Sequence, residues 1–362
     1  MMGKRSLRDF SMILALGLVA AYFSLASPQF LSARNLSMLA IELSITATLA
    51  LGMLLIILPG HIDLSVGSGV GLLGGIASVL VFHHGWPAVL AMVLSLTTGI
   101  LVWFLMGSLV VRQRMPAFII TLGGLLVFKG LFWLVIRNAT VPVAPGGTHN
   151  LYSLLTTYYL PRPAGWALAA AGTSVCAFAV QGEDAEDRFL KAFLAAQGLF
   201  LFTLVMNQFR GIPLPVLILG LVAGAVAVLT EHTPFGRHLY AIGGNEEASV
   251  VSGVPVQRTI IAAFAIMGSI TAVTGFMQTA YAGASTTSIG ELMELDAIAA
   301  CVIGGTSLKG GRGSALRVLF GSLIMATLLN GMTLLAVSPE FKYIARGLVL
   351  ALAVWVDVRL SR

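Results

Sequence analysis

Apolar runs of helix length, separated by short polar segments, follow one another along almost the whole chain. A helix that crosses a hydrocarbon core of about 30 Å needs about 20 apolar residues. Runs that approach or exceed this length lie at 10–27, 36–58, 66–83, 88–111, 116–136, 164–181, 190–206, 213–230, 259–282, 295–307, 315–337 and 341–358. The pattern predicts an all-α integral membrane protein, a polytopic bundle of about 10–12 transmembrane helices in a single domain over residues 1–362.

Two glycine-punctuated cassettes interrupt this pattern, PGHIDLSVGS at 59–68 and ELDAIAACVIGGTSLKGGRGS at 294–314. Each holds an acidic residue, Asp63 or Asp296, beside or within an apolar run, where a charge costs about 2.5–3.5 kcal/mol on insertion scales. Their glycines also free backbone polar groups that lipid cannot satisfy. Broken or re-entrant segments of this kind persist where they line a protein-enclosed pathway, so we expect a transporter. The candidate pathway residues in the cassettes are Asp63, Ser65, Asp296, Gly304, Gly305 and Thr306.

Three further polar residues lie inside apolar runs. Asn330 and Glu42 either form hydrogen bonds between helices or belong to the same pathway. Lys129 either extends to the membrane surface or pairs with an acid across the bundle, for which Glu42 is the candidate.

Composition supports a lipid environment and excludes several classes of protein. The chain is 57% hydrophobic and 10% charged, whereas soluble domains carry about 25% charged residues. No GxxxxGK[ST], HExxH, CxxC or GxSxG motif occurs, and the two cysteines, Cys176 and Cys301, read as buried small hydrophobes. We therefore expect no catalytic residue, no metal site and no cofactor in this chain.

The net charge of +6 comes from basic residues spread in ones and twos between the apolar runs, which argues against nucleic-acid binding. The excess of Lys and Arg in alternate loops favours both termini inside. It also places the loop 231–258 inside and the loop 137–163 outside. A cleaved signal peptide over residues 1–26 is the disfavoured alternative, because many spans follow.

The inner loop 231–258 contains the signals of a short capped helix. Asn245 is a predicted N-cap, Glu246 lies in the first turn, and Gly253 is a predicted C-terminal cap. Such a helix is either an ordinary connector or a docking element for a cytoplasmic partner.

Several motifs in consistent order carry a resemblance to a known family. They are GHIDLSVG at 60–67, FGRHLYAIGGN at 235–245, LDAIAACVIGGTSL at 295–308, NGM at 330–332 and YIARGLVLALAVWVD at 343–357. The chain resembles the permease subunits of ATP-binding cassette importers for monosaccharides of the ribose/xylose type. GIPLPV at 211–216 and the acidic loop 181–188 make it most similar to the xylose-type members.

The resemblance implies a multi-pass protein of the bacterial inner membrane that works as a dimer of permease subunits. Its partners would be a cytoplasmic ATPase, which binds the ATP, and a periplasmic sugar-binding protein. The inner loop would dock on the ATPase through Phe235, Gly236, Arg237, Gly244, Asn245, Glu246, Ala248 and Gly253. Two alternatives stay open, an ion-coupled secondary transporter and a related permease for ribose, nucleosides or branched-chain amino acids.

Overall fold

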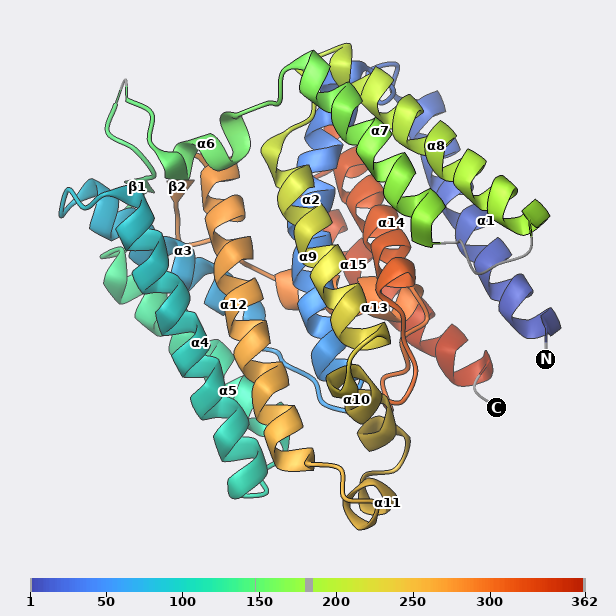
Figure 1. Ribbon diagram of the computed structural model, residues 1–362. Helices are drawn as coiled ribbons and strands as arrows, with labels where there is room; N and C mark the ends of the chain where they lie inside the picture. The colour runs from blue at the N-terminus through green and yellow to red at the C-terminus, as the bar shows by residue number, and fades with distance from the viewer. Residues whose placement is uncertain (1, 147, 180–184, 361–362) are drawn as a thin grey trace.

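The computed structural model describes residues 2–146, 148–179 and 185–360, which form a helical bundle with one small antiparallel strand pair (Figure 1). The helices are α1 (Met2–Ala26), α2 (Ala33–Ile57), α3 (Val66–Phe82), α4 (Ala88–Arg112), α5 (Ala117–Val135), α6 (Leu151–Thr157), α7 (Arg162–Ala179), α8 (Ala185–Asn207), α9 (Leu214–Glu231), α10 (Pro234–Gly244), α11 (Glu246–Val251), α12 (Val256–Ala282), α13 (Met293–Ile303), α14 (Ala315–Leu334) and α15 (Pro339–Leu360). Strand β1 (Val141–Pro142) pairs with β2 (Ala284–Ser285), with Val141 opposite Ser285.

The all-α membrane fold expected from the apolar runs is confirmed. Within the described residues, six helices are long and apolar enough to cross a membrane, namely α2, α4, α5, α9, α12 and α14. The tenth run is the short helix α13 of 11 residues, about 16 Å at 1.5 Å per residue, roughly half of the hydrocarbon core. It is therefore a half-helix that ends inside the bundle.

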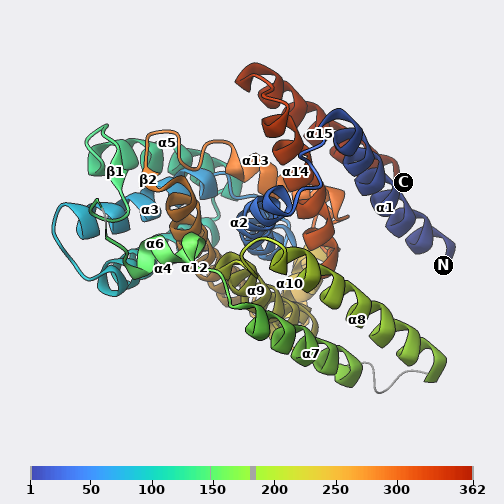
Figure 2. The ribbon, with the colours of Figure 1, turned by 90° about the horizontal axis from the view of Figure 1, so that it is seen from above.

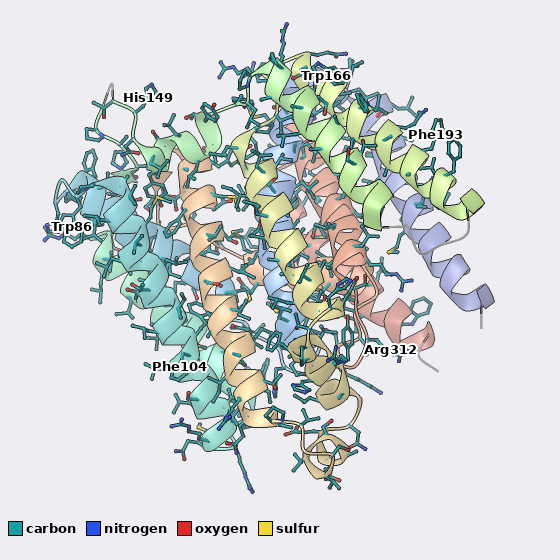
Figure 3. All side chains as sticks on the ribbon, viewed as in Figure 1. Trp86, Phe104, His149, Trp166, Phe193 and Arg312 are labelled. Carbon is teal, nitrogen blue, oxygen red and sulfur yellow. The ribbon has the colours of Figure 1, made fainter. Side chains whose placement is uncertain are left out.

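Helix α2 lies near the centre of the bundle and packs against α9, α12, α13 and α14, whereas α4 and α5 lie further to one side (Figure 2). In the most apolar stretch of α2, 83% of the residues are buried inside the protein. In the corresponding stretches of α5 and α9 the buried share is 17% each. A helix that is apolar on all sides must be enclosed by protein or face lipid. Phe104 on α4 and Phe193 on α8 point away from the bundle, as expected of lipid-facing side chains (Figure 3).

The two ends of the bundle differ in structure. Helices α10 and α11 lie together at one end, whereas α6, β1 and β2 lie at the other (Figure 1). His149 and Arg312 mark these opposite ends in Figure 3. The loops 231–258 and 137–163, expected on opposite sides of the membrane, are thus at opposite ends of the molecule. We call them the α11 end and the α6 end.

Small residues allow the most extensive helix pair, α4 with α12, to pack closely. A Cβ placed on Gly99 would lie 2.8 Å from the backbone oxygen of Gly268, and a Cβ on Gly268 would meet the oxygen of Gly99. Close backbone approach through small residues is the usual way in which helices associate in membranes.

The two glycine cassettes lie against each other. The Gly311 amide donates a hydrogen bond of 2.9 Å to the Leu58 carbonyl oxygen, directly before the first cassette. Gly67 and Gly290 are in backbone contact, which leaves no room for a side chain on either residue. The break before α3 and the half-helix α13 are therefore parts of one packed unit.

Candidate functional site

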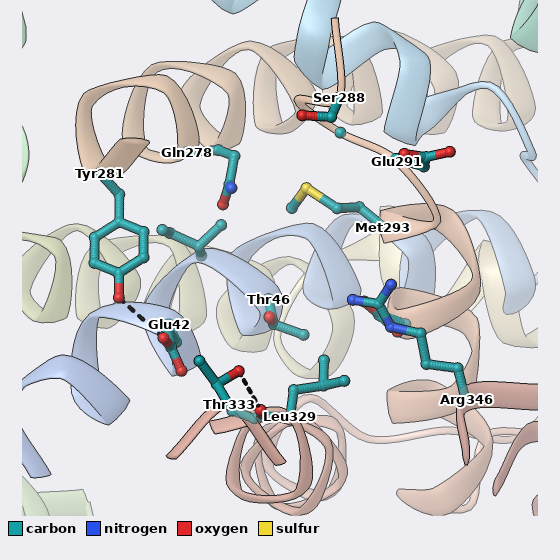
Figure 4. Close-up of a pocket in the computed structure, with 14 residues that line it drawn as sticks. Glu42, Thr46, Gln278, Tyr281, Ser288, Glu291, Met293, Leu329, Thr333 and Arg346 are labelled. Atoms are coloured by element: carbon teal, nitrogen blue, oxygen red, sulfur yellow. Dashed lines mark hydrogen bonds and ion pairs between the residues drawn. The ribbon is translucent and has the colours of Figure 1, made fainter. Parts of the chain in front are cut away.

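A polar cavity of about 220 Å³ lies between α2, α12, α13, α14 and α15 (Figure 4). Its lining is unusual for a membrane protein interior, because acids, a base, an amide and hydroxyls line it together. The lining residues are Glu42, Ile45, Thr46, Gln278, Tyr281, Ser288, Gly290, Glu291, Met293, Asp296, Ala326, Leu329, Thr333 and Arg346.

The cavity belongs to the half of the bundle nearest the α6 end. Tyr281 lies one residue before the end of α12, and Thr333 one residue before the end of α14. Glu42 lies in the third turn of α2, and Arg346 in the second turn or just beyond it in α15. These four positions lie within about three turns of the helix ends that face the α6 end, so the cavity is an outer vestibule if that end is outside.

Buried apolar residues close the cavity toward the α11 end. Leu49–Ile57 of α2 are all buried, and Ala297–Val302 of α13 are buried as well. The closing elements also touch, since the Cys301 thiol donates a hydrogen bond of 3.2 Å to the Ala50 carbonyl oxygen. Packed protein therefore closes the cavity on the side of the α11 end.

Glu42 is held by side chains from two other helices. Tyr281 donates a hydrogen bond to its Oε1 at 2.9 Å, and the Asn330 amide donates to its Oε2 at 3.1 Å. Asn330 in turn accepts a hydrogen bond of 2.9 Å from Asn35. Lys129 lies over the Trp133 ring at 5.6 Å, and the acid with which its charge interacts is Glu294 of α13, not the expected Glu42.

Asp296 lies in the first turn of the half-helix α13 and lines the cavity, with 5% of its surface exposed. Its Oδ1 is 3.1 Å from Nε of Arg346 on α15, which forms an ion pair across the two helices. A carboxylate near a helix N-terminus is also stabilised by the helix dipole. Of the candidate pathway residues, Asp296 is the one that lines the cavity. Asn330 does not line it, but forms a hydrogen bond with the lining residue Glu42.

Asp63 and Ser65 lie in a different environment. The Asp63 carboxylate is fully buried and accepts hydrogen bonds from the Ser65 amide at 2.8 Å, from the Ser65 hydroxyl at 2.6 Å and from Trp103 Nε1 at 2.6 Å. These bonds fix the break before α3. They do not bring Asp63 to the cavity, so a pathway role for Asp63 and Ser65 stays a prediction.

Gly304, Gly305 and Thr306 lie at the opposite end of α13 from the cavity. A Cβ on Gly304 would be 2.5 Å from the Arg317 backbone oxygen, so α13 and α14 are in close contact there. Gly305 has a φ of 84°, which favours glycine, and Thr306 is fully buried. A pathway role for these residues also stays a prediction.

The capped helix expected in the loop 231–258 is present as α11. The Asn245 side chain accepts a hydrogen bond of 2.9 Å from the Ala248 amide, and Gly253 follows the helix with a φ of 79°. Gly244, Glu246, Ala248 and their neighbours up to Gly253, except Ser249, are exposed, and we call residues 244–253 the α11 surface.

The three remaining candidates in this loop lie at the start of α10. Arg237 is exposed, Phe235 is half-buried, and Gly236 is buried against the backbone of Thr230 at the end of α9. Phe235 and Gly236 therefore fix the turn between α9 and α10.

Helix α10 connects the α11 surface to the cassette that holds Asp296. The Tyr240 hydroxyl donates a hydrogen bond of 3.0 Å to the Gly313 carbonyl oxygen. Gly243 packs directly on the backbone of Leu58 and Gly311, where a Cβ would not fit. A displacement of α10 would thus reach both glycine cassettes through backbone contacts.

Sequence reasoning missed most residues of the cavity, among them Gln278, Tyr281 and Arg346. Gln278 and Tyr281 lie near the end of an apolar run, where polar residues also occur at membrane interfaces. The pattern of Lys and Arg residues assigned Arg346 to the outer side of the membrane and gave no sign of a role in a cavity. A usable signal was the spacing of Lys342 and Arg346, which places two bases on one face of a helix.

Comparison with known proteins gives one family and several close relatives. The model of the family described as "Branched-chain amino acid transport system / permease component" matches residues 35–354. The xylose transport system permease protein of Escherichia coli is 39% identical, with 99% of this chain and 93% of the relative covered. That of Haemophilus influenzae is 38% identical, with 97% and 96% covered.

More distant relatives are also sugar permeases by name. The ribose import permease protein of Escherichia coli is 32% identical, with 98% of this chain and 95% of the relative covered. No solved structure matches the chain.

Proposed function

The chain belongs to the family of branched-chain amino acid transport system permease components, and we propose that it is the membrane-spanning subunit of an ATP-binding cassette importer for a pentose, most similar to the xylose systems. The observation that carries the proposal is the polar cavity, which lies in the half of the bundle nearest the α6 end and is closed toward the α11 end by buried apolar residues. Relatives named for xylose and ribose transport support a sugar as the substrate.

The proposed orientation puts the α11 end and both chain termini in the cytoplasm of a bacterium. Arg112, Arg258 and Arg312 belong to helix ends and loops at the α11 end, whereas Arg34, Arg137 and Arg162 belong to the α6 end. The excess of basic residues in alternate loops supports this assignment. The cavity then lies in the periplasmic half of the bundle.

Three partners follow from this orientation. The α11 surface would dock on a cytoplasmic ATPase, which binds and hydrolyses the ATP, since this chain has no nucleotide-binding motif. The α6 end would receive a periplasmic sugar-binding protein. A second permease subunit would complete the transporter in the membrane.

The test is uptake by the reconstituted complex. The permease is placed in proteoliposomes with its ATPase and its binding protein, and uptake of labelled xylose, ribose and leucine is measured with ATP. We expect saturable xylose uptake that stops when the ATPase carries a Walker substitution and continues when a protonophore collapses the proton gradient.

Two results would contradict the proposal. Uptake that follows the proton gradient while ATP is maintained would identify an ion-coupled secondary transporter. Uptake of leucine in preference to every sugar would identify an amino acid permease.

A further inference from the structure

We propose that the cavity between α2, α12, α13, α14 and α15 is a binding site for one neutral, polyhydroxylated molecule of pentose size, held inside the permease itself during passage. The inference rests on the proposed function, because it names the step at which the sugar leaves its binding protein and enters this chain. It goes beyond that function in assigning a specific site within a single subunit.

Free polar groups in the cavity support a ligand with many hydroxyls. Within the described part of the chain, the side chains of Gln278 and Thr46 make no hydrogen bond, although both line the cavity (Figure 4). An amide supplies two donors and an acceptor, and a hydroxyl supplies one donor and two acceptor lone pairs. Sugar hydroxyls, which both donate and accept, complement these two groups.

Two of the three carboxylates that line the cavity, Glu42 and Asp296, add acceptors with spare capacity. Each oxygen of Glu42 accepts one hydrogen bond, whereas a carboxylate offers about four acceptor sites. Asp296 is 5% exposed; its Oδ1 is enclosed beside Arg346, whereas its Oδ2 is not enclosed and accepts no hydrogen bond from any described residue. A buried acceptor without a hydrogen bond is costly, so a ligand hydroxyl at Asp296 would be favourable.

The charges of the site favour a neutral ligand. Arg346 offsets Asp296 at 3.1 Å, and Lys342, which donates to Thr333 at 3.1 Å, brings a second positive charge to the side of the cavity that holds Glu42. With Glu291, an exposed acid that also lines the cavity, three acids stand against two bases, so neither sign is in large excess. Ile45, Met293 and Leu329 line the cavity as well and offer apolar contact for the carbon skeleton of a sugar.

The volume limits the ligand to a small molecule. Pockets for drug-sized ligands occupy about 300–1,000 Å³, and this cavity has about 220 Å³. A single monosaccharide fits this scale better than a disaccharide.

The experiment measures access to the cavity in the assembled complex. Cysteine is placed at Thr46 or at Gln278 in a Cys176→Ser, Cys301→Ala background that retains uptake, and labelling by a membrane-impermeant maleimide is followed from the binding-protein side. We expect xylose-loaded binding protein to slow labelling at both positions about fivefold or more, because a bound ligand excludes the reagent. His149→Cys, in the exposed outer loop, should label at the same rate with or without sugar.

Sugar-free binding protein distinguishes occupancy from shielding by the docked partner. Protection by the loaded form alone supports the site. Equal protection by both forms, or no protection in a complex that still takes up xylose, would overturn the site and leave the proposed function standing. Failure to take up any sugar would overturn the proposed function, and the inference with it.

A second measurement does not depend on cysteine chemistry. Thr46→Val keeps the volume and removes the hydroxyl, and we expect about a fivefold loss of xylose uptake, the effect of one hydrogen bond of about 1 kcal/mol. Thr46→Ser should restore uptake. Unchanged uptake in Thr46→Val would count against a sugar contact at this position.

Discussion

Trp103 on α4 donates a hydrogen bond of 2.6 Å from its indole Nε1 to Oδ2 of Asp63, in the break between α2 and α3. Both side chains are buried, Asp63 completely. The bond joins a glycine cassette to a helix 40 residues further along the chain. The conformation of the break therefore depends on a partner outside the cassette.

Trp103→Phe removes this donor and leaves a buried carboxylate oxygen without its partner. We expect a loss of about 1–3 kcal/mol of folding free energy, the usual cost of an unsatisfied buried acceptor. Thermal unfolding of the purified protein in detergent would measure it. Trp133→Phe is the matched control, since its indole is half-exposed and donates a longer hydrogen bond of 3.3 Å to Thr287; equal loss in both variants would contradict the assigned role of Asp63.

Asp63→Asn keeps the shape of the side chain and removes its charge. Because Asp63 is anchored by Ser65 and Trp103 and lies away from the cavity, we expect reduced ATP-driven uptake with an unchanged dependence on pH. The measurement is the initial rate of sugar uptake between pH 5.5 and 8, a range that brackets ordinary histidine titration. A new pH dependence in the variant would indicate a proton-carrying role instead.

The sequence was sufficient to predict the long helices, because each crossing needs a long apolar run and little else in the chain meets that requirement. The short helices α6 and α10, which lie in the polar loops, were not predicted. The cap of α11 was also predictable, since Asn245 and Gly253 act within one turn of their own helix. The cavity was not. Glu42, Gln278, Asp296 and Arg346 come from four helices, and their convergence depends on how α12, α13 and α15 pack around α2.

Asp63 shows why the pathway was hard to read from the sequence. An acid beside a glycine break has the same sequence signal whether it faces a pathway or anchors the chain. Asp63 finds its partners in Ser65 and Trp103, whereas Asp296 finds Arg346 at the edge of the cavity. Only the position of the partner separates the two cases.

Gly268→Ala should weaken the contact between α4 and α12. A Cβ at this position would meet the backbone of Gly99, which cannot move without separating the helices. We expect a loss of about 1–3 kcal/mol, typical of overpacking a tight contact, seen as a lower unfolding temperature in detergent. Gly220→Ala on α9 is the control, because no atom lies within 4 Å of its added Cβ; a similar loss there would show that the close approach is not the cause.

Ala248→Arg tests the α11 surface. Ala248 is exposed on a short helix, so a bulky cation there should leave the permease folded in the membrane and disturb docking of the ATPase. We expect normal membrane insertion with loss of coupling between ATP hydrolysis and uptake. Gln113→Arg, which adds a cation at the exposed end of α4 outside the α11 surface, should retain coupling. Normal uptake together with normal co-purification of the ATPase in Ala248→Arg would exclude this surface as the docking site.

Arg346 and Asp296 form an ion pair between α15 and the half-helix α13, and this pair can be tested by a double-mutant cycle. Arg346→Gln leaves a carboxylate at membrane depth without its positive partner. Removing one partner of a fully buried pair costs about 3–5 kcal/mol; because 22% of the Arg346 side chain is exposed, we expect a smaller loss, about 1–3 kcal/mol. Asp296→Asn should be destabilised less, since the remaining arginine can reach water in the cavity.

The double variant, Arg346→Gln with Asp296→Asn, separates the structural role of the pair from its role in transport. With both charges gone no unpaired carboxylate remains, so the unfolding temperature should recover most of the loss seen in Arg346→Gln. Xylose uptake should stay low, because the double variant no longer has the Asp296 acceptor that faces the cavity. Additive losses of stability would show that the two residues do not interact, and full recovery of uptake would show that Asp296 serves only to hold α15 in place.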